Sequence, residues 1–362
     1  MKIAIFHNFM DNIGGAEMVG LTLARELKAD FYSTNIDEDK IKKMGFGQIR
    51  LKSIGRVPFN APYRQQAALG RFRRLNLEKQ YDFYIIDGDW AMSAAVNHKP
   101  NLWYVHSPIR EIWDLYRYTR QNTVPFYLRW GFDAWAGYNR HLNKRYVRHV
   151  DKLACNSRNT QQRIKKYFGR NAAVIHPPIE TSRFQYKKNG DYWLSVNRLI
   201  THKRVDTQME AFSRLPDEKL IVVGSYEQAG HFRRHADYIR KIKPANVGIL
   251  SWVGRSQLLE LYANCRGFIT TSRDEDFGMA PVEAMASGKP VIAPNEGGYK
   301  ETVIDGVTGE LIDDINPDKL VQAIKEIGKD PAKYKEACLK QAAKFDTKVF
   351  IAKIKDQIKR GR

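Results

Sequence analysis

The chain has 362 residues, enough for two domains of ordinary size, and 43% of them are hydrophobic. This hydrophobic share, which includes 12% aromatic residues, supports buried cores and excludes an intrinsically disordered chain. The 60 Lys and Arg against 40 Asp and Glu give a net charge of +20, which favours an anionic partner such as nucleic acid, anionic lipid or a phosphorylated substrate.

Cysteine usage and apolar runs indicate the compartment. Cys155, Cys265 and Cys338 are far apart and odd in number, which argues against a disulfide framework or a zinc site and favours a reducing cytoplasm. The amino-terminal MKIAIFHNF is too short for a signal-peptide core and is interpreted as a buried strand. No run approaches the roughly 18 apolar residues of a spanning helix. We therefore expect a cytoplasmic protein that is soluble or lies on a membrane surface.

Strand and helix patterns alternate along the chain and restart near its middle. In the first half, strands are predicted at 2–6, 83–87, 102–106, 152–157 and 172–178, with a helix over 16–27. In the second half, strands are predicted at 192–198, 219–224, 247–254, 267–272 and 290–294, with helices over 206–215, 256–265 and 280–287. Such alternation indicates parallel sheets covered by helices. The predicted fold class is α/β, with two doubly wound Rossmann-like domains.

The domain boundaries are placed from the Pro177-Pro178 turn and the end of the second pattern. We predict an N-terminal domain over 1–180, a C-terminal domain over 181–345 and a final segment over 346–362. The last helix, 347–360, is amphipathic, and we expect it to pack back on the N-terminal domain.

Two short motifs have the chemistry of phosphate sites. Asn12-Ile13-Gly14-Gly15 follows the first strand, where glycines and a helix start let backbone N–H groups approach a phosphate. A plain strand-to-helix turn explains the two glycines almost as well. Arg198 and Lys203 follow a predicted strand end, where open α/β sheets bind ligands, and they suit a diphosphate. The alternative for this pair is a solvated basic turn.

The stretch EDFGMAPVEAMASGKPVIA places two carboxylates around a helix start. The N–H groups of Gly278, Met279 and Ala280 are donors at that start, with Pro281 in the first turn. Glu283, about one turn into the helix, is placed to reach a polyol, and Glu275 in the preceding loop is placed to hold further hydroxyls. A capping acid and a surface acid are the alternative if the pair is taken alone.

This stretch resembles the signature of the retaining nucleotide-sugar glycosyltransferases of family 4, which have the GT-B fold, two Rossmann-like domains facing across a cleft. The resemblance spans nearly the whole chain and keeps the family's order. Its elements are the GGAE turn, HSP at 106–108, NS at 156–157, HPP at 176–178, VNRL at 196–199, HKR at 202–204 and GG…E at 297–301.

The resemblance implies a role for each matching residue. Arg198 and Lys203 bind the donor diphosphate, and Gly14 and Gly15 approach it from the other domain. Glu283 binds the ribose, whereas Glu275 contacts the transferred sugar beside the backbone of Phe277, Gly278, Met279 and Ala280. His106 borders the donor sugar near the reacting carbon. The expected reaction is front-face transfer with retention, with His106, Arg198, Lys203 and Glu275 as catalytic residues and with no metal or other cofactor.

The acceptor side is suggested by a second resemblance. Residues 106–116 resemble the HSP-x-R-x-x-W-D-x-Y stretch of mannosyltransferases that act on lipid-linked glycans, which implies GDP-mannose as donor and a polyprenyl-linked glycan as acceptor. Arg110, Trp113 and Asp114 are assigned to the acceptor side, together with Asp89. The Asp87-Gly88-Asp89 triplet is interpreted as lining the acceptor cleft.

A basic segment suggests a membrane surface. Arg50–Arg74 carries seven basic residues and no acidic one, with Phe59, Leu69 and Phe72 interleaved, as an interfacial helix and loop on anionic lipid would require. The residues expected at the membrane are Arg56, Arg64, Arg71, Arg73 and Arg74. A solvated basic face above core aliphatics is the alternative, but the basic and aromatic stretch 116–148 favours peripheral association with the inner face of the cell membrane.

Other classes fit the sequence less well. A UDP- or ADP-hexose donor with a soluble acceptor is the nearest alternative, followed by a GT-B-fold epimerase, which is not expected to carry both the acidic and the basic pair. A nucleic-acid-binding protein fits the charge, but the sequence has none of the motifs of such modules. A dinucleotide oxidoreductase requires G-x-G-x-x-G after the first strand, which this sequence does not have.

Overall fold

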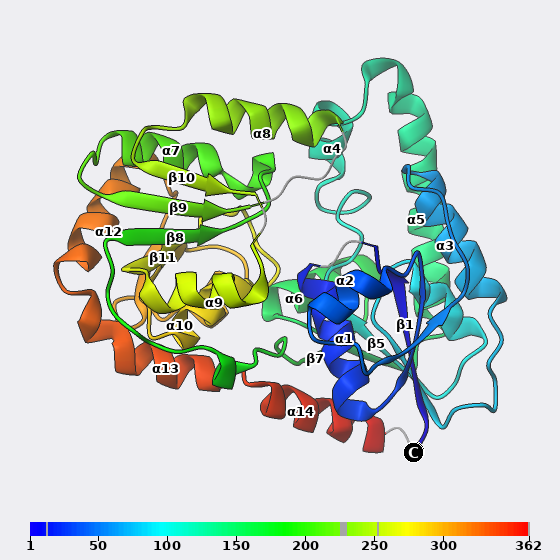
Figure 1. The fold of residues 1–362 in the computed structure, drawn as a ribbon. Helices are drawn as coiled ribbons and strands as arrows, with labels where there is room; N and C mark the ends of the chain where they lie inside the picture. The colour runs from blue at the N-terminus through cyan, green and yellow to red at the C-terminus, as the bar shows by residue number, and fades with distance from the viewer. Residues whose placement is uncertain (12–13, 225–229, 252, 361–362) are drawn as a thin grey trace. The chain divides into compact units, whose positions relative to one another are not determined.

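A computed structural model describes residues 1–11, 14–224, 230–251 and 253–360. These residues form two compact units (Figure 1). The first unit comprises Met1–Pro178 and the chain from Phe350 onward, and the second comprises Ile179–Val349. Asn12 and Ile13 of the predicted glycine turn and Trp252 of a predicted strand lie outside the described residues, as do the last two residues of the final segment.

The first unit is built on a seven-stranded sheet in the order β3-β2-β1-β4-β5-β6-β7, and every neighbouring pair is parallel. Its strands are β1 (Ile3–Phe9), β2 (Asp30–Thr34), β3 (Arg50–Ser53), β4 (Phe83–Ile86), β5 (Asn101–Val105), β6 (Lys152–Cys155) and β7 (Ala173–Val174). Its helices are α1 (Gly15–Leu27), α2 (Glu38–Lys43), α3 (Tyr63–Arg74), α4 (Tyr116–Asn122), α5 (Arg129–Val147) and α6 (Arg158–Phe168). The central strands are buried on both faces, as their near-continuous apolar runs require.

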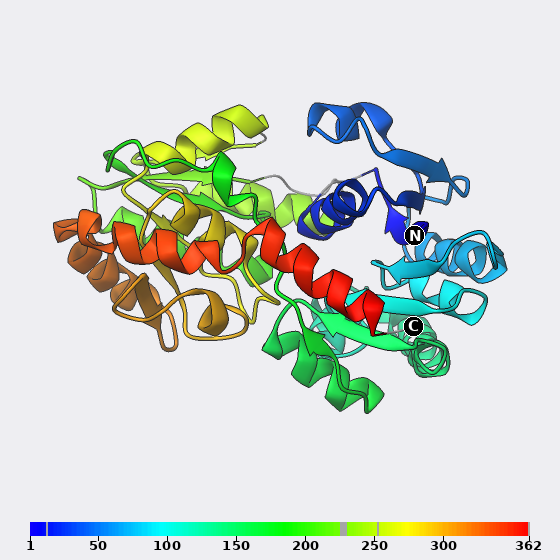
Figure 2. The same cartoon turned by 90° about the horizontal axis from the view of Figure 1, so that it is seen from below.

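The last helix, α14 (Thr347–Lys359), packs against the first unit (Figure 2). Its Phe350 ring meets the ring of Tyr104 on β5 edge-on, with 5.5 Å between the centroids. Ile354 and Ile358 are buried, and Lys152 Nζ donates a hydrogen bond to the Gln357 carbonyl at 2.6 Å. The amphipathic pattern of this helix therefore supplies apolar side chains to the first core, although the chain reaches it only after completing the second unit.

The second unit has a six-stranded sheet in the order β10-β9-β8-β11-β12-β13, again with all neighbours parallel. Its strands are β8 (Tyr192–Val196), β9 (Lys219–Val223), β10 (Val247–Leu250), β11 (Gly267–Ile269), β12 (Val291–Pro294) and β13 (Gly309–Ile312). Its helices are α7 (Val205–Ser213), α8 (Gly230–Ile242), α9 (Arg255–Asn264), α10 (Met279–Ala286), α11 (Tyr299–Thr302), α12 (Pro317–Lys329) and α13 (Lys335–Ala343). Two parallel, helix-covered sheets confirm the predicted α/β class.

Both sheets reverse their strand order at one point. In the first unit the order turns between β1 and β4, and in the second between β8 and β11. In open parallel sheets the loops that leave the two central strands go to opposite faces at such a point, so a crevice forms outside the carboxyl ends. Candidate ligand groups are therefore expected in the loops after these four strands.

The basic segment Arg50–Arg74 differs from its sequence interpretation. It forms β3, a loop and α3, and the side chains of Leu69 and Phe72 are buried in the first core rather than exposed to lipid. The prediction that they insert into a membrane was wrong, because they occupy the inward face of an amphipathic helix. Phe59, in the loop, is 76% exposed.

Several arginines of this segment also have structural partners. Arg64 NH2 donates to Asp11 Oδ1 at 2.5 Å, and its guanidinium lies 4.0 Å from the centroid of the Phe9 ring. Arg71 donates to the carbonyls of Ile54 and Arg56 at 3.1 and 2.8 Å. Arg73 NH1 donates to Asn97 Oδ1 at 3.2 Å, whereas the side chains of Arg56 and Arg74 are exposed. Across the described ranges, no helix has both the length and the apolar character needed to cross a bilayer.

We expect Phe72→Ala to lower the free energy of unfolding by about 3–5 kcal/mol, because it removes a fully buried aromatic ring. Phe59→Ala, at a position that is 76% exposed, is the matched control and is expected to change stability by no more than about 0.5 kcal/mol. Urea unfolding followed by circular dichroism measures both. A stable Phe72→Ala protein with impaired vesicle binding would instead restore the membrane interpretation of this helix.

Candidate active site

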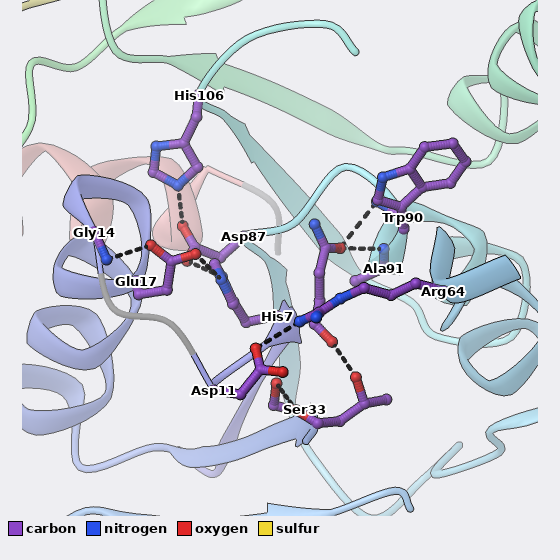
Figure 3. A network of polar contacts seen from close by, with 12 residues as sticks. His7, Asp11, Gly14, Glu17, Ser33, Arg64, Asp87, Trp90, Ala91 and His106 are labelled. Atoms are coloured by element: carbon purple, nitrogen blue, oxygen red, sulfur yellow. Dashed lines mark hydrogen bonds and ion pairs between the residues drawn. The ribbon is translucent and has the colours of Figure 1, made fainter. Parts of the chain in front are cut away.

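Three side chains meet at the carboxyl edge of the first sheet, next to its reversal point. His7 lies on β1, Asp87 follows β4 and His106 follows β5 (Figure 3). His7 Nδ1 is 2.8 Å from Asp87 Oδ2, and His106 Nε2 is 2.9 Å from Asp87 Oδ1. One carboxylate therefore bridges two imidazoles that come from different strands.

The first helix extends this network to the glycine turn. Glu17 Oε1 lies 3.5 Å from His7 Nε2, and its other carboxyl oxygen accepts a hydrogen bond from the Gly14 N–H at 2.8 Å. Gly20 on α1 lies directly over Asp87, since a Cβ atom there would be 2.4 Å from Asp87 Oδ2. The glycine at this position therefore permits the close approach of helix and carboxylate. A continuous polar chain connects Gly14 to His106.

The charged groups of this network are stabilised by one another and by hydrogen bonds rather than by solvent. Burial alone would lower the pKa of His7, but hydrogen bonds to Asp87 and Glu17 outweigh it and raise the pKa to about 10. Burial also opposes charge on Asp87 and His106, yet their mutual attraction lowers the pKa of Asp87 and raises that of His106. Asp87 is fully buried, whereas the His106 side chain is 18% exposed. His106 is thus the histidine of the network that reaches the surface, since the His7 side chain is only 3% exposed.

The interpretation of Asp87 as a residue lining an acceptor cleft was wrong, because its carboxylate is buried between the two histidines. Asp89, two residues further on, is only partly buried. Burial lowers the pKa of His106 and Asp87 raises it, and the charge of Asp89 raises it further by a smaller amount. The chain immediately after Asp89 is fixed by Asn8, whose Oδ1 accepts hydrogen bonds from the N–H groups of Trp90 and Ala91.

The other residues predicted on the acceptor side form a cluster of their own. Arg110 Nε donates to Asp114 Oδ2 at 2.9 Å, and Arg163 NH2 lies 3.6 Å from the same oxygen. Trp113 stacks on Tyr167 with 4.8 Å between ring centroids. These contacts hold Arg110, Trp113 and Asp114 together beside α6, and their role toward an acceptor stays a prediction.

In the second unit, Lys203 and Glu275 come together across the reversal point. Lys203 follows β8 and Glu275 follows β11, and Lys203 Nζ donates to Glu275 Oε2 at 2.5 Å. Ser272 Oγ donates to the same oxygen at 2.5 Å. Burial alone would raise the pKa of Glu275, but Lys203 and Ser272 lower it to about 2. Arg198, five residues before Lys203, has an exposed side chain.

Glycines explain how the loops of this edge approach one another. Gly297 has φ +58°, and a Cβ atom there would lie 2.5 Å from the Glu275 carbonyl oxygen. A Cβ atom at Gly298 would be 2.4 Å from Phe277 Cα, and the Gly298 N–H donates to the Glu275 carbonyl at 2.8 Å. The loop that carries Glu275 is therefore fixed by backbone contact with the loop after β12. Side chains at positions 297 and 298 would force these loops apart.

Helix α10 begins immediately after Gly278, which has φ +86° and so takes a backbone conformation that favours glycine. The first N–H groups of this helix, including those of Met279 and Ala280, point toward its start. Glu283, within the helix, accepts a hydrogen bond from Tyr262 OH at 2.9 Å and lies 3.7 Å from Arg255 NH1. Burial raises the pKa of Glu283 against the opposing effect of Arg255.

The structure thus pairs Lys203 directly with Glu275 and places Phe277, Gly278 and Glu283 on the elements next to them. The sequence did not predict Ser272 as a partner of Glu275, or Arg255 and Tyr262 as partners of Glu283. In the first unit it did not predict His7 and Glu17, which extend the Asp87 network. His7 and Asp87 stand at the ends of predicted strands 2–6 and 83–87, and that position was a usable signal. Within the part of the chain that the structure describes, no group of three or more His, Cys, Asp or Glu side chains is arranged to hold a metal ion.

Two protein-family models match the chain, one on each half. The model described as Glycosyltransferase Family 4 matches residues 13–183, and the model described as Glycosyl transferases group 1 matches residues 178–345. Together they span residues 13–345, which include every residue of the two candidate networks except His7.

Individual proteins that are similar to this chain are also named as glycosyltransferases. The chain is 27% identical over 189 residues to an uncharacterized glycosyltransferase, MJ1178, of Methanocaldococcus jannaschii, and this match spans only 52% of either protein. It is 25% identical over 374 residues to the alpha-1,3/1,6-mannosyltransferase ALG2 of Candida glabrata, which covers 84% of this chain and 78% of that protein. A crystal structure of Anabaena HepE in complex with UDP and glucose superposes with a TM-score of 0.80 at 19% identity and 99% coverage of both chains. At that identity the likeness shows the fold.

We expect Asp87→Asn to lower the pKa of both His7 and His106, because burial disfavours an imidazolium that has lost its counter-ion. Loss of the shared carboxylate is also expected to lower the free energy of unfolding by about 3 kcal/mol. Side-chain 15N NMR across a pH series measures the imidazole titrations. Asp82→Asn is the control, since the Asp82 carboxylate is 53% exposed and accepts from the Lys2 N–H at the amino end of β1. An unchanged His106 titration in Asp87→Asn would contradict this description of the network.

The Lys203–Glu275 pair gives a pH-dependent prediction. Glu275 has a pKa of about 2 in the folded chain, below the value of about 4.3 expected when unfolded. The pair therefore stabilises the folded chain fully at pH values above the pKa of the unfolded chain. This stabilisation is lost as the pH falls toward 2. We expect Lys203→Met to be less stable than wild type at pH 7, with a difference that shrinks on acidification. Urea midpoints at several pH values test this, with Lys300→Met, at an exposed lysine, as the control. A difference that is constant with pH would argue against the pair.

Proposed function

Since the chain belongs to the glycosyltransferases of family 4 and has the GT-B fold, we propose that it is a retaining mannosyltransferase. In this proposal it moves mannose from GDP-mannose to a polyprenyl-linked glycan at the cytoplasmic face of a membrane. The observation that carries the proposal is the direct contact between Lys203 and Glu275 at the reversal point of the second sheet.

That contact matches the chemistry of a nucleotide-sugar. A sugar diphosphate presents an anionic group and a polyol joined through one oxygen atom, so its binding site needs a cation and a hydroxyl acceptor side by side. Lys203 Nζ and Glu275 Oε2 are 2.5 Å apart. In the proposal, Lys203 and Arg198 bind the diphosphate as a point charge and a planar fork. Glu275 accepts hydrogen bonds from the sugar hydroxyls, and the N–H groups at the start of α10 face the phosphates.

Glu283 is assigned to the ribose. Its carboxylate is held from behind by Tyr262 OH at 2.9 Å and by Arg255 at 3.7 Å, which fixes the side chain in one orientation. A carboxylate fixed in this way accepts hydrogen bonds from the two hydroxyls of a ribose without losing conformational entropy when the ligand binds. Tyr262 and Arg255 are thus positioning residues for Glu283.

The proposed reaction is a front-face displacement. The acceptor hydroxyl oxygen bonds to the anomeric carbon on the side from which the diphosphate departs, so configuration is retained. The bond between that carbon and the phosphate oxygen breaks, its electron pair goes to the diphosphate, and the acceptor proton passes to the same leaving group. Lys203, Arg198 and the start of α10 stabilise the negative charge that develops there. No step of this proposal uses a metal ion.

His106 is assigned to the donor sugar on the first unit. Asp87 holds its Nε2 at 2.9 Å, and this contact helps keep the imidazole charged. A cationic imidazole near the reacting carbon favours an approaching anionic donor and orients sugar hydroxyls by donating from Nδ1. His7 and Glu17 act through Asp87 and position His106.

Mannose is supported by a relative, and GDP by the resemblance of residues 106–116, rather than by geometry. The relative from Candida glabrata is named as a mannosyltransferase, and it covers most of this chain. The fold neighbour HepE was crystallised with UDP and glucose, so a UDP-hexose is the alternative donor. The cytoplasmic, peripheral location and the lipid-linked acceptor are supported by the net charge of +20, which suits an anionic surface.

Donor binding tests the proposal. A thermal-shift screen across GDP, UDP and ADP and their hexose conjugates identifies the donor, and GDP-mannose is expected to give the largest shift. By calorimetry, Arg198→Ala and Lys203→Ala are expected to weaken nucleotide binding by about 2–5 kcal/mol, because each removes a charge-assisted phosphate contact. Arg214→Ala, at the far end of α7, is the matched control.

The two glutamates are expected to separate in the same measurement. Glu283→Ala weakens binding of the bare nucleotide, whose ribose it holds, whereas Glu275→Ala leaves nucleotide binding intact and lowers turnover. Equal losses of nucleotide affinity in both variants would refute this division of roles. NMR of the product then reports its anomeric configuration, and an inverted product would rule out the retaining mechanism.

A further inference from the structure

The connection between α4 and α5 exposes a run of large apolar side chains. The exposed fractions are 78% for Phe126, 62% for Tyr127, 51% for Leu128 and 76% for Trp130. Singly exposed apolar residues are common on soluble proteins, but a contiguous group of this size marks a contact surface. We call residues 126–130 the aromatic tip. Figure 1 shows the α4–α5 connection projecting away from the sheet of the first unit.

The aromatic tip stands on an ordered base. Asp133 on α5 accepts hydrogen bonds from Tyr116 OH at 2.6 Å and from Arg120 Nε at 2.8 Å, which fastens α4 to α5. The rings of Tyr116 and Phe132 stack with 5.6 Å between centroids. Arg129 NH2 donates to the Gln121 carbonyl at 3.0 Å across the connection. These contacts hold the two helix ends together while the apolar side chains between them face solvent.

The charge around the aromatic tip selects an anionic partner. Residues 116–148 contain seven Lys and Arg but only one acidic residue, Asp133, which is already paired with Arg120. Along α5 the large exposed side chains change from Trp130 in the first turn and Tyr138 in the middle to Lys144 and Arg145 in the last turn, with Arg148 immediately after it. An aromatic end and a cationic end on one helix suit a surface that offers an apolar layer beneath anionic groups.

We infer that the aromatic tip inserts into the headgroup region of an anionic lipid bilayer. Trp and Tyr favour that region because their rings are apolar while their N–H and O–H groups still find polar partners. Lys and Arg near an anionic leaflet add attraction that salt screens. The inference rests on the proposed function for its purpose, since a polyprenyl-linked acceptor keeps its chain in the bilayer. Its physical basis, exposed aromatics beside cations, is independent of the donor.

The segment that inserts into the membrane is thus the aromatic tip rather than Arg50–Arg74. In Arg50–Arg74 the side chains of Leu69 and Phe72 are buried, so the large apolar side chains that the segment leaves exposed are Phe59 at 76% and Tyr63 at 71%. The aromatic tip offers four adjacent apolar side chains within reach of cations on the same helix pair. Insertion is therefore assigned to the aromatic tip, and the arginines of α3 contribute electrostatic attraction only.

A site-specific fluorophore tests the location of insertion. Cys155, Cys265 and Cys338 are all buried, so a thiol-reactive, polarity-sensitive dye labels a cysteine introduced at an exposed position. Phe126→Cys reports on the aromatic tip, and Phe59→Cys is the matched control in the basic segment, with 78% and 76% exposure respectively. With phosphatidylcholine vesicles that contain phosphatidylglycerol, we expect a blue shift at position 126 and none at 59. A blue shift at 59 alone, or at neither position, would overturn the inference.

Binding of the full chain to the same vesicles gives a second readout. The variant Phe126→Ser/Leu128→Ser/Trp130→Ser is expected to bind them about tenfold or more weakly, because three apolar side chains lose their burial in lipid. The double variant Phe59→Ser/Tyr238→Ser, at side chains that are 76% and 50% exposed, is the control and should leave vesicle binding unchanged. Equal binding by wild type and the triple variant would refute insertion. So would a wild-type dimer in light scattering that the triple variant abolishes, since a second copy would then cover the aromatic tip.

The two proposals fail separately. Calorimetry with GDP-mannose is expected to give the same affinity for wild type and the triple variant, because the aromatic tip is not part of the donor site. Loss of vesicle binding with intact donor binding supports insertion. Absence of donor binding in both proteins would reject the proposed function and leave the vesicle result standing by itself.

Discussion

The arrangement of this molecule depends on one constraint, the reversal of strand order in two all-parallel sheets. Parallel strands bring all their carboxyl ends to one edge, and the reversal sends neighbouring loops to opposite faces. In the first unit the reversal lies between β1, which carries His7, and β4, which Asp87 follows. In the second it lies between β8 and β11, which precede Lys203 and Glu275. Residues 80 and 72 positions apart in sequence become hydrogen-bond partners as a result. The chemistry of each unit is thus a consequence of its topology.

Both networks solve the same electrostatic problem in the same way. A charge removed from water is unfavourable unless an opposite charge with good geometry replaces the solvent. Asp87 is the opposite charge for two imidazoles and is itself fully buried. Lys203 is the opposite charge for Glu275, and the Ser272 hydroxyl donates a further hydrogen bond to it. Glycines allow the required approach: Gly20 faces Asp87, and Gly297 lies against the backbone of Glu275. The ionised groups are therefore fixed before any ligand arrives, which is the condition for electrostatic stabilisation of a developing charge.

The sequence predicted the fold class and brought Lys203, Glu275 and Glu283 into consideration, because strand ends, helix starts and paired charges follow local rules. It predicted neither β2 nor β3, whose mixed polar and apolar residues lack a clear period. Leu69 and Phe72 were interpreted as membrane residues because the choice between the core face and the outer face of a helix depends on what packs against it. Asp87 was placed on a surface for the same reason: the two histidines that bury it come from residues 7 and 106. Long-range partners of this kind follow from the assembled sheet rather than from nearby residues.

The central claim is that the carboxyl edge of the second sheet holds a nucleotide diphosphate-sugar between its basic and acidic residues. Hydrogen–deuterium exchange with mass spectrometry, comparing free protein with protein saturated with GDP-mannose, tests this most directly because it reports the backbone that a ligand contacts. The account predicts slower exchange in the peptides that contain residues 198–204 and 275–283, with little change in the helices on the opposite edge of that sheet. Saturating ligand that protects other segments and leaves these two unchanged would contradict it.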